Sequence, residues 1–419
     1  MRSKEMFAYH TFCLALFLWT CCSVKYNSAI PLIGYLVGMI LMSVGVSMIC
    51  VWSKKCRGRP ESVGIIIFAV LVNLGMSVNY RCTKAEKITW NSTYLVDLTL
   101  MIAVFAVMYL GVRYTKIYRF HIFNFMVSII LPVTIFGARL SGRKTGGSYL
   151  YFAGFMIFGL VLLGFPFVAA WFMSLEENKY WRGKVGNISW NLLGFLGYTF
   201  LIYIGCGMCN EFGLLLIVGL TATVLFWIRC KDTKLKILYT VLCISGALMA
   251  TSNISHLRGR VQIWLNPAEA FYNTNLKEKA ESVLYLFRNF ESMGWWSRGI
   301  GNLSKRIYPT LNTDHVLILL MNDYSVLLAV LVMILGIVFV RWMLILPKNV
   351  CAYDKYLNMT SALIVCFIML IDISSNLGSF ITAGIGFPWI SDGSSVNIML
   401  TGLMAVHIGL LRKGGEENG

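Results

Sequence analysis

Long apolar runs recur along almost the whole chain, and they constrain its fold more than any other feature. A run of roughly 17 to 25 apolar residues forms an α-helix that can cross a hydrocarbon core about 30 Å thick, and about twelve runs meet this criterion. They cover residues 6–24, 31–53, 63–80, 95–112, 120–138, 149–173, 188–207, 212–228, 237–252, 315–340, 357–378 and 394–411. Of the 419 residues, 58% are hydrophobic and only 13% are charged. The sequence therefore predicts an all-α polytopic membrane protein with no separate soluble domain.

Lys and Arg are concentrated in alternate loops between these runs, and this bias predicts the orientation. Loops rich in Lys and Arg stay on the cytoplasmic side because these residues resist translocation. The basic loops are Lys54–Arg59, Arg113–Arg119, Lys179–Lys184, Arg229–Lys236 and Arg341–Lys355. Both termini are therefore expected in the cytoplasm, and the long segment 253–314 is expected outside. The net charge of +17 is scattered over short loops, which excludes a nucleic-acid-binding face and favours contact with membrane lipids.

The outer segment 253–314 contains an amphipathic pattern. Apolar residues recur at helical spacing from Leu276 to Phe290, and Lys, Glu and Arg fill the other face. This pattern predicts a helix at the membrane surface. The following stretch MGWWSRGIGN has glycines beside two Trp residues and Arg298. It fits either a surface for a lipid-linked phosphate or an interfacial loop with an aromatic anchor.

Thr313 and Asp314 end the outer segment where the next apolar run begins. A Thr or Asp at this position could cap the free N–H groups at the start of a helix. A carboxylate at the boundary between water and membrane could also serve as general base for a sugar hydroxyl whose lipid carrier stays in the bilayer. The residues alone leave both interpretations open.

The 12 cysteines do not predict a metal site. Most lie inside apolar runs, where Cys behaves as a small hydrophobic residue. Cys206 and Cys209 form a Cys-x-x-Cys pair, but no second pair follows at metal-ligand spacing. Chemistry is therefore expected from the loops and helix ends.

Three stretches resemble the SEDS family (shape, elongation, division and sporulation), the membrane glycosyltransferases typified by RodA, FtsW and SpoVE. RVQIWLNP (Arg260–Pro267), followed by WSRGIGN and YPTLNTD, is similar to the family's outer loop. NLGSFITAGIGFPWISDGSS (Asn376–Ser395) is similar to its late signature. CNEFGLLLIVG (Cys209–Gly219) is similar, more weakly, to a Pro-Asp-Leu-Gly motif, with Glu211 in place of the acid.

The resemblance implies a domain organisation. Residues 63–412 would form a SEDS-like core of ten helices with its large outer loop at 253–314. Residues 1–62 would add two N-terminal transmembrane helices, and residues 413–419 a cytoplasmic tail. The chain also departs from the family: the Trp that should follow Gly137-Ala138-Arg139 is missing, and a Gln-Pro-Ser-Glu motif with a nearby Lys is absent from SYLYFAGFMIFGL. Asn322-Asp323-Tyr324-Ser325 replaces Glu-Glu-Leu-Gly.

The reaction implied by the resemblance is polymerisation of lipid II into glycan strands at the outer face of a bacterial plasma membrane, for elongation, division or sporulation. The GlcNAc 4-hydroxyl of one lipid II would attack the anomeric carbon of an undecaprenyl-linked glycan, and undecaprenyl pyrophosphate would leave. An α-linked donor and a β-linked product require inversion in a single displacement. Such a step needs a base for the hydroxyl and positive charge for the departing phosphates.

By this resemblance Asp314 is the candidate base. The residues expected to bind substrate are Arg260, Trp264, Arg139, Arg143, Lys144, Arg298, Thr313, Asn376, Ser391 and Ser395. Those expected to support the site are Glu211, Asp323, Gly301, Pro267 and Gly393. The serines and Gly393 could equally serve only turn formation and helix-end packing.

Two acids have further expected roles. Glu211 could bind a divalent cation, Mg or Mn, or orient the basic residues. It could also be an ordinary surface acid. No other cofactor is expected. Asp323 would lie about 13 Å deeper than Asp314 along a regular helix. An acid at that depth is a functional candidate because burying an unpaired charge in a membrane is costly.

The resemblance also implies a partner, a class B penicillin-binding protein that acts as transpeptidase. Two other functions stay open on the sequence. Many spans around a polar cavity also suit a flippase for a lipid-linked precursor. The missing Glu, Lys and Trp also suit a non-catalytic scaffold of the wall-synthesis complex.

Overall fold

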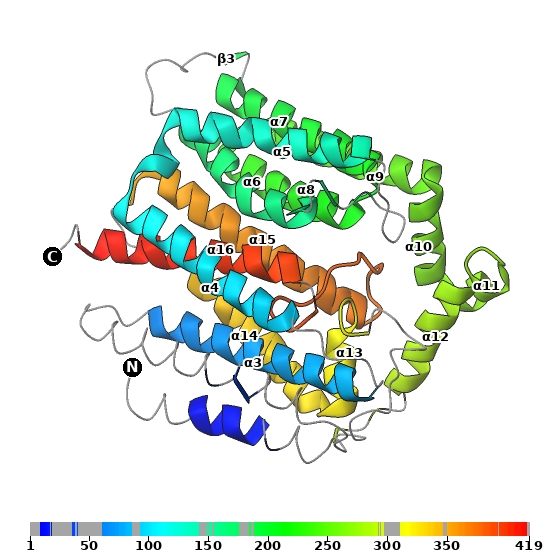
Figure 1. Cartoon of the computed structure of the whole chain (residues 1–419). Coiled ribbons are helices and arrows are strands. Elements are labelled where there is room, and N and C mark those ends of the chain that lie inside the picture. Colours follow the sequence, from blue (N-terminus) through cyan, green and yellow to red (C-terminus); the bar gives the residue numbers. More distant parts are fainter. Residues whose placement is uncertain are drawn as a thin grey trace. The chain divides into compact units, whose positions relative to one another are not determined.

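The computed structural model is predominantly helical (Figure 1). It describes residues 9–16, 18, 36–37, 40, 61–85, 93–141, 149, 151–152, 155–175, 184–185, 188–291, 293, 295–296, 311–346, 350–392 and 394–416. Strands in these residues are limited to two short hairpins, β1 (Tyr151–Phe152) with β2 (Phe155–Met156) and β3 (Lys184–Val185) with β4 (Ile188–Ser189). The all-α prediction is confirmed. The chain forms two compact units, which we describe in turn.

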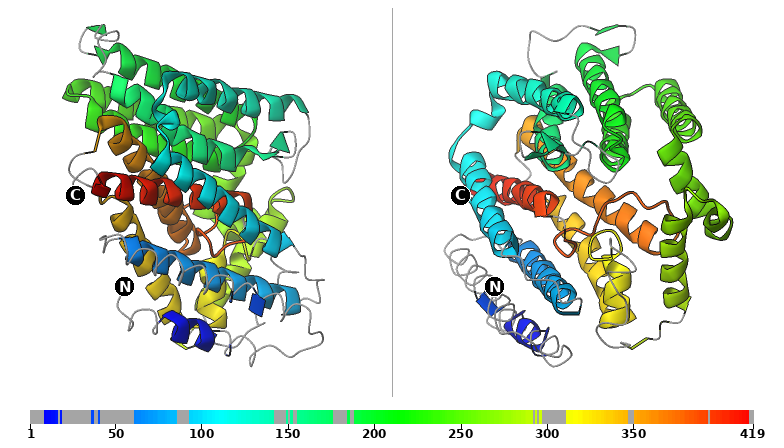
Figure 2. Two further views of the ribbon diagram at one scale, coloured as in Figure 1. Left: turned by 60° about the vertical axis from the view of Figure 1, so that its left-hand side comes forward. Right: turned by 45° about the vertical axis from the view of Figure 1, so that its right-hand side comes forward.

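The first unit comprises residues 1–96, 245–342 and 368–393. Its helices are α3 (Glu61–Ala85), α10 (Ser255–Leu265), α11 (Pro267–Tyr272), α12 (Lys277–Glu291), α13 (Val316–Asp323), α14 (Val326–Met343) and the C-terminal part of α15 (Ala352–Asn376). α12 confirms the amphipathic helix predicted in the outer segment. Ile263, Ala270 and Ala280 form a small core that joins α10, α11 and α12. The ribbons of these three helices follow one another in yellow-green in Figure 2. The described part of the predicted outer loop is therefore built largely from three packed helices.

The apolar run predicted at 315–340 is not one regular helix. α13 ends at Asp323, and the N–H groups of Tyr324 and Ser325 both donate to the carbonyl of Leu320, at 3.0 and 3.1 Å. Ser325 then starts α14, because its Oγ accepts a hydrogen bond from the N–H of Leu328 at 3.0 Å. The depth of about 13 Å expected along a regular helix therefore does not apply to Asp323, which lies at a helix end and is 1% exposed.

Trp389 anchors the segment that follows α15. Its side chain is 2% exposed and packs edge-on against Phe68 of α3 and Phe339 of α14. Its backbone adopts the left-handed conformation with φ of 63°, which costs a non-glycine residue about 1–3 kcal/mol. Burial of the large aromatic ring offsets this strain. Residues 377–392 are thus fixed against α3 although they contain no helix.

Gly75 of α3 lets this segment approach closely. A Cβ added at Gly75 would lie 2.3 Å from the backbone oxygen of Trp389. Gly75→Ala should therefore destabilise the protein by about 1–3 kcal/mol through overpacking and lower its Tm. Gly111→Ala in α4 (Thr93–Tyr114) is the matched control, because no atom lies within 4 Å of its added Cβ. Equal Tm values for the two variants in detergent would contradict this packing.

The second unit comprises residues 97–244, 343–367 and 394–419. Besides most of α4, it contains a 3-10 turn (Ile117–Arg119), α5 (His121–Ser141), α6 (Ile157–Ser174), α7 (Trp190–Met208), α8 (Phe212–Arg229), part of α9 (Thr233–Asn253), the N-terminal part of α15 and α16 (Ser394–Glu416). α6 is central, since it packs against α5, α7, α8 and α16. Arg119 forms an ion pair with Asp354 of α15, in which Nε donates to Oδ1 at 3.0 Å. The helix predicted to start at residue 149 begins only at Ile157, because residues 151–156 include the β1–β2 hairpin.

Nine helices in the described ranges are long and apolar enough to cross a membrane: α4, α5, α6, α7, α8, α9, α14, α15 and α16. A shorter apolar segment, Val63–Asn79, lies in α3. Several of these helices expose large apolar side chains, such as Val107, Leu248 and Ile337, as expected of surfaces that face lipid. The chain is therefore a multi-pass membrane protein.

The two N-terminal runs predicted at 6–24 and 31–53 lie mostly outside the described residues. In the part that is described, Tyr9, Cys13 and Leu16 are buried. The hydroxyl of Tyr9 accepts a hydrogen bond from Nδ2 of Asn73 on α3 at 2.9 Å. The number of N-terminal helices stays a prediction.

Candidate functional site

Asp314 lies in the turn of residues 311–315 that leads into α13. The helix N-cap is His315, whose side chain makes no capping hydrogen bond. The N–H of Ile318 is instead capped from another element, since it donates to Oδ1 of Asn376 at 3.3 Å. The interpretation of Thr313 and Asp314 as caps of this helix is therefore wrong, because the helix starts later and Asn376 caps it.

Asn376 also fixes the backbone that carries Asp314. Its Nδ2 donates to the carbonyl oxygens of Asp314, at 3.0 Å, and Asp372, at 2.9 Å. The Asn376 side chain is 2% exposed, so water does not compete for these hydrogen bonds. One amide thus joins the end of α15 to both Asp314 and the start of α13.

Asn376→Ala should lower the kcat of the enzyme proposed below by about 10- to 100-fold, because a displacement of about 1 Å at a reacting group has an effect of this size. The effect on KM should be smaller, since Asn376 positions Asp314. Asn275→Ala, at an exposed asparagine before α12, is the control. A kcat equal to that of the control would exclude a positioning role for Asn376.

The carboxyl of Asp314 is tuned by its surroundings. Burial raises its pKa to about 6, while a hydrogen bond with Thr313 and the positive charge of Arg260 act in the opposite direction. Arg260 on α10 is held by the segment after α15, because its Nη1 donates to the carbonyl of Thr382 at 2.9 Å. A carboxyl with this pKa is ionised at neutral pH and is a stronger base than an ordinary aspartate.

The segment after α15 packs directly on the turn that carries Asp314. The N–H of Asp392 donates to the carbonyl of Asn312 at 2.8 Å, and Nδ2 of Asn312 donates to Oδ2 of Asp392 at 2.9 Å. A Cβ added at Gly386 would lie 2.5 Å from the carbonyl oxygen of Thr313 and 2.4 Å from Oγ of Ser391. The fold therefore brings together six predicted site residues of this unit: Arg260, Trp264, Thr313, Asp314, Asn376 and Ser391.

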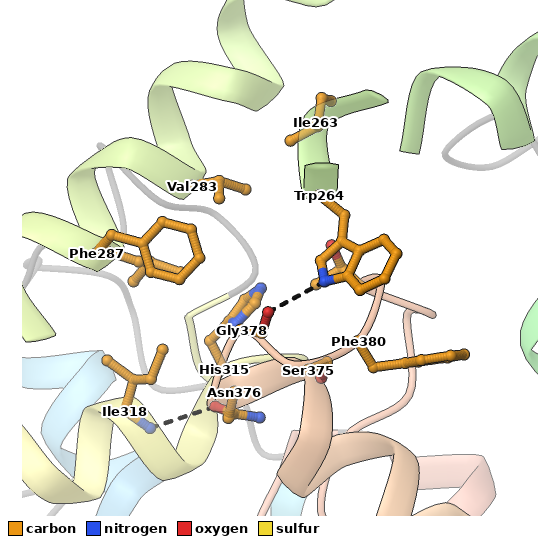
Figure 3. A pocket seen from close by; sticks show the side chains of 12 residues that line it. Ile263, Trp264, Val283, Phe287, His315, Ile318, Ser375, Asn376, Gly378 and Phe380 are labelled. Carbon is orange, nitrogen blue, oxygen red and sulfur yellow. Dashed lines mark hydrogen bonds between the residues drawn. The ribbon is translucent and has the colours of Figure 1, made fainter. Parts of the chain in front are cut away.

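A pocket lies beside this turn, between α10, α12 and the end of α15 (Figure 3). Its walls are mostly apolar or aromatic, and Trp264, Phe287 and Phe380 are the largest of the side chains that line it. The ring of His315 lies between Phe287 and Trp264 in this view. Trp264 is fixed because its Nε1 donates to the carbonyl of Gly378 at 3.0 Å.

Two residues of this region were not predicted as site residues. Asp372 is fully buried in α15, and neither of its carboxyl oxygens has a hydrogen-bond partner among the described residues. The rule that marked Asp323, an acid inside an apolar run, applies equally to Asp372 and could have found it. His315 carried no such signal, because its position in the pocket depends on tertiary packing.

The second unit holds three more of the predicted site residues, Arg139, Glu211 and Ser395. The guanidinium of Arg139 lies over the ring of Tyr149, 4.4 Å from its centroid, and the N–H of Tyr149 donates to the carbonyl of Cys209 at 2.9 Å. Glu211 is 8% exposed and immediately precedes α8. Ser395 Oγ donates to the sulfur of Met156 at 2.7 Å. No group of three His, Cys, Asp or Glu side chains in the described ranges is arranged to hold a metal ion.

The remaining predicted residues are of two kinds. Pro267 is the first residue of α11. Asn266 caps this helix, because its side chain accepts a hydrogen bond from the N–H of Glu269 at 3.2 Å. The structure therefore gives Pro267 a role in starting a helix. The others lie outside the described residues: Arg143, Lys144, Arg298, Gly301 and Gly393.

Comparisons with known proteins agree with this architecture. A chain from a peptidoglycan synthase complex that coordinates polymerisation and crosslinking is 15% identical, with a TM-score of 0.62 over 84% of this chain and 97% of that one. The rod shape determining protein RodA of Thermus thermophilus is 12% identical, with a TM-score of 0.52 over 83% of this chain and 94% of that one. These likenesses concern the fold.

Two curated relatives are similar in sequence. The probable peptidoglycan glycosyltransferase FtsW of Alcanivorax borkumensis is 23% identical over 336 residues, which are 76% of this chain and 82% of that protein. The peptidoglycan glycosyltransferase RodA of Mycobacterium leprae is 25% identical over 245 residues, 57% of this chain and 45% of that protein. The family described as cell cycle protein, FtsW/RodA/SpoVE, matches residues 60–413. Because this match covers most of the chain, the protein is a member of the FtsW/RodA/SpoVE family, the SEDS family.

Proposed function

We propose that this protein is a peptidoglycan glycosyltransferase that polymerises lipid II at the outer face of a bacterial plasma membrane. The observation that carries the proposal is Asp314, a carboxyl whose pKa burial raises to about 6, with the charge of Arg260 acting on it. Family membership and the names of the two relatives support the same reaction.

In the proposed reaction Asp314 is the general base. Its carboxylate takes the proton of the acceptor sugar's 4-hydroxyl while the oxygen attacks the anomeric carbon of the donor. The bond from that carbon to the pyrophosphate breaks, and inversion converts an α-linked donor into a β-linked product. Arg260 stabilises the negative charge that develops near the site. This electrostatic interaction is strongest in surroundings of low dielectric constant.

The proposed orientation follows the distribution of Lys and Arg. Both termini lie in the cytoplasm, and α10, α11 and α12 lie outside with Asp314. Ten helices form the family core, with two more at the N-terminus. On this side of the membrane Arg139, Arg143, Lys144 and Arg298 contribute positive charge for the pyrophosphate. Glu211 holds a divalent cation, Mg or Mn, or orients these basic residues.

A class B penicillin-binding protein is the proposed partner. The similar chain with a TM-score of 0.62 belongs to a complex that joins polymerisation to crosslinking, which supports a transpeptidase as the second component. Lipid II and an undecaprenyl-linked glycan are the proposed substrates.

The test uses the purified full chain in liposomes given fluorescent lipid II, with and without the penicillin-binding protein. Glycan polymer from the wild type, and none from an Asp314→Asn preparation made in parallel, is the expected result. Movement of lipid II between leaflets without polymer would instead identify a flippase. Full complementation of a deletion strain by Asp314→Asn would identify a scaffold.

A further inference from the structure

We infer that the pocket lined by Trp264, Phe287, Phe380 and His315 binds the acetamido group of the acceptor's N-acetylated amino sugar. The inference rests on the proposed function, because it assumes a sugar substrate. It adds a recognition site that acts through hydrogen bonding and apolar contact, without charge.

The aromatic wall of the pocket is preformed. Besides its hydrogen bond to Gly378, the indole of Trp264 packs near Phe380, with ring centroids 6.5 Å apart. Gly378 has φ of 71°, and a Cβ there would lie 2.8 Å from Cε1 of Phe287. Glycine at this position therefore allows Phe287 to approach from α12. A ligand meets an ordered apolar surface and does not have to organise it.

The polar part of the pocket is the imidazole of His315, together with Ser375, Asn376 and Thr382. The Asn376 amide and the Ser375 hydroxyl already bond to protein, the latter to the carbonyl of Asp372 at 3.0 Å. Burial lowers the pKa of His315 to about 4, so the ring is neutral at physiological pH. A neutral imidazole presents one N–H donor and one acceptor nitrogen, which can pair with the carbonyl or the N–H of an acetamido group.

The described residues around the pocket disfavour other parts of lipid II. Among these residues no Lys, Arg, Asp or Glu lines the pocket, so a pyrophosphate or a peptide carboxylate would lose water without gaining a direct counter-charge from them. A hydrocarbon chain would bury the imidazole against groups that cannot form hydrogen bonds, which is unfavourable. An acetamido group combines an apolar methyl with one donor and one acceptor, and so fits both parts of the surface.

The position of the pocket suits the acceptor sugar. His315 follows Asp314 directly, and Asn376 both lines the pocket and bonds to the carbonyl of Asp314 at 3.0 Å. In a 2-acetamido sugar the 4-hydroxyl is two ring carbons away from the acetamido carbon. A sugar held by its acetamido group therefore brings this hydroxyl within one ring's width of the pocket, on the element that carries the base.

The test measures equilibrium binding to the full chain in nanodiscs. The probes are lipid II, lipid II with the acetamido group of its GlcNAc removed to the amine, and undecaprenyl phosphate. Wild type should bind the deacetylated lipid about 10-fold or more weakly. His315→Leu should lose most of this difference and leave undecaprenyl phosphate binding unchanged, while His315→Gln, which keeps a donor and an acceptor, should retain part of it. Glu281→Gln, at an exposed position on α12, is the control.

Each outcome is decisive. Equal binding of the two lipid II forms by the wild type would overturn the inference, whether or not the protein polymerises lipid II. A change in undecaprenyl phosphate binding equal to the change in lipid II binding would assign the pocket to the lipid chain and also overturn it. The binding measurement needs no turnover. If the protein binds lipid II more tightly than its deacetylated form but makes no polymer, this inference stands and only the proposed reaction is contradicted.

Discussion

Asp314→Asn should lower the kcat of lipid II polymerisation by about 10²- to 10⁴-fold, the range expected for loss of a general base. Asparagine matches aspartate in shape but cannot accept the proton of the attacking hydroxyl. Asn376 bonds to the backbone carbonyl of Asp314, which the substitution keeps. The loss should therefore be chemical, with the fold intact and lipid II binding changed little.

Two controls make this result specific. Glu281→Gln removes an exposed carboxyl of the same unit and should have wild-type kcat. The Tm of Asp314→Asn should be equal to or higher than that of the wild type, because a neutral amide costs less to bury than a carboxylate, and its elution volume should be unchanged. A kcat within threefold of the control would show that another group takes the proton, and Asp372 would then be the first to examine.

Arg260→Gln should reduce kcat by about 10²- to 10³-fold, as found when a group that stabilises developing charge is removed. It should also change the pH dependence in a defined direction. The charge of Arg260 acts against the burial that raises the pKa of Asp314. Without this charge the pKa rises further above 6, so the pH at which activity is half-maximal moves upward.

The shift in pH dependence separates two roles of Arg260. Arg258→Gln, at an exposed arginine of the same helix, should leave both kcat and the pH midpoint unchanged. If Arg260→Gln lowered kcat without moving the midpoint, Arg260 would act on the substrate alone. Unchanged kcat would remove it from the site.

Much of this site could be predicted because its residues lie in local motifs. Arg260, Asp314 and Asn376 come from stretches far apart in sequence, and the fold joins them through hydrogen bonds around one turn. The amphipathic period likewise predicted α12, since a helix at the membrane surface must separate its apolar and charged faces.

The remainder depends on contacts that no local pattern encodes. The break after Asp323 lies inside a long apolar run, and the helices on both sides of Ser325 are apolar. The cap of α13 comes from Asn376, which is 58 residues from Ile318. His315 became part of a pocket because Phe287 and Trp264 approach it from other helices (Figure 3). Tertiary packing decided each of these features.

The pH dependence of lipid II polymerisation by the purified wild type, from about pH 4.5 to 8.5, tests the central claim most directly, because it reports the ionisation of the base itself. The burial of Asp314 predicts that kcat/KM is constant above its pKa of about 6 and falls about tenfold per pH unit below it. Unfolding midpoints measured across the same range separate this loss from acid unfolding. A midpoint near 4, the value of an ordinary aspartate, or a flat profile would contradict the role of Asp314. Absence of polymer at every pH would contradict the proposed function itself.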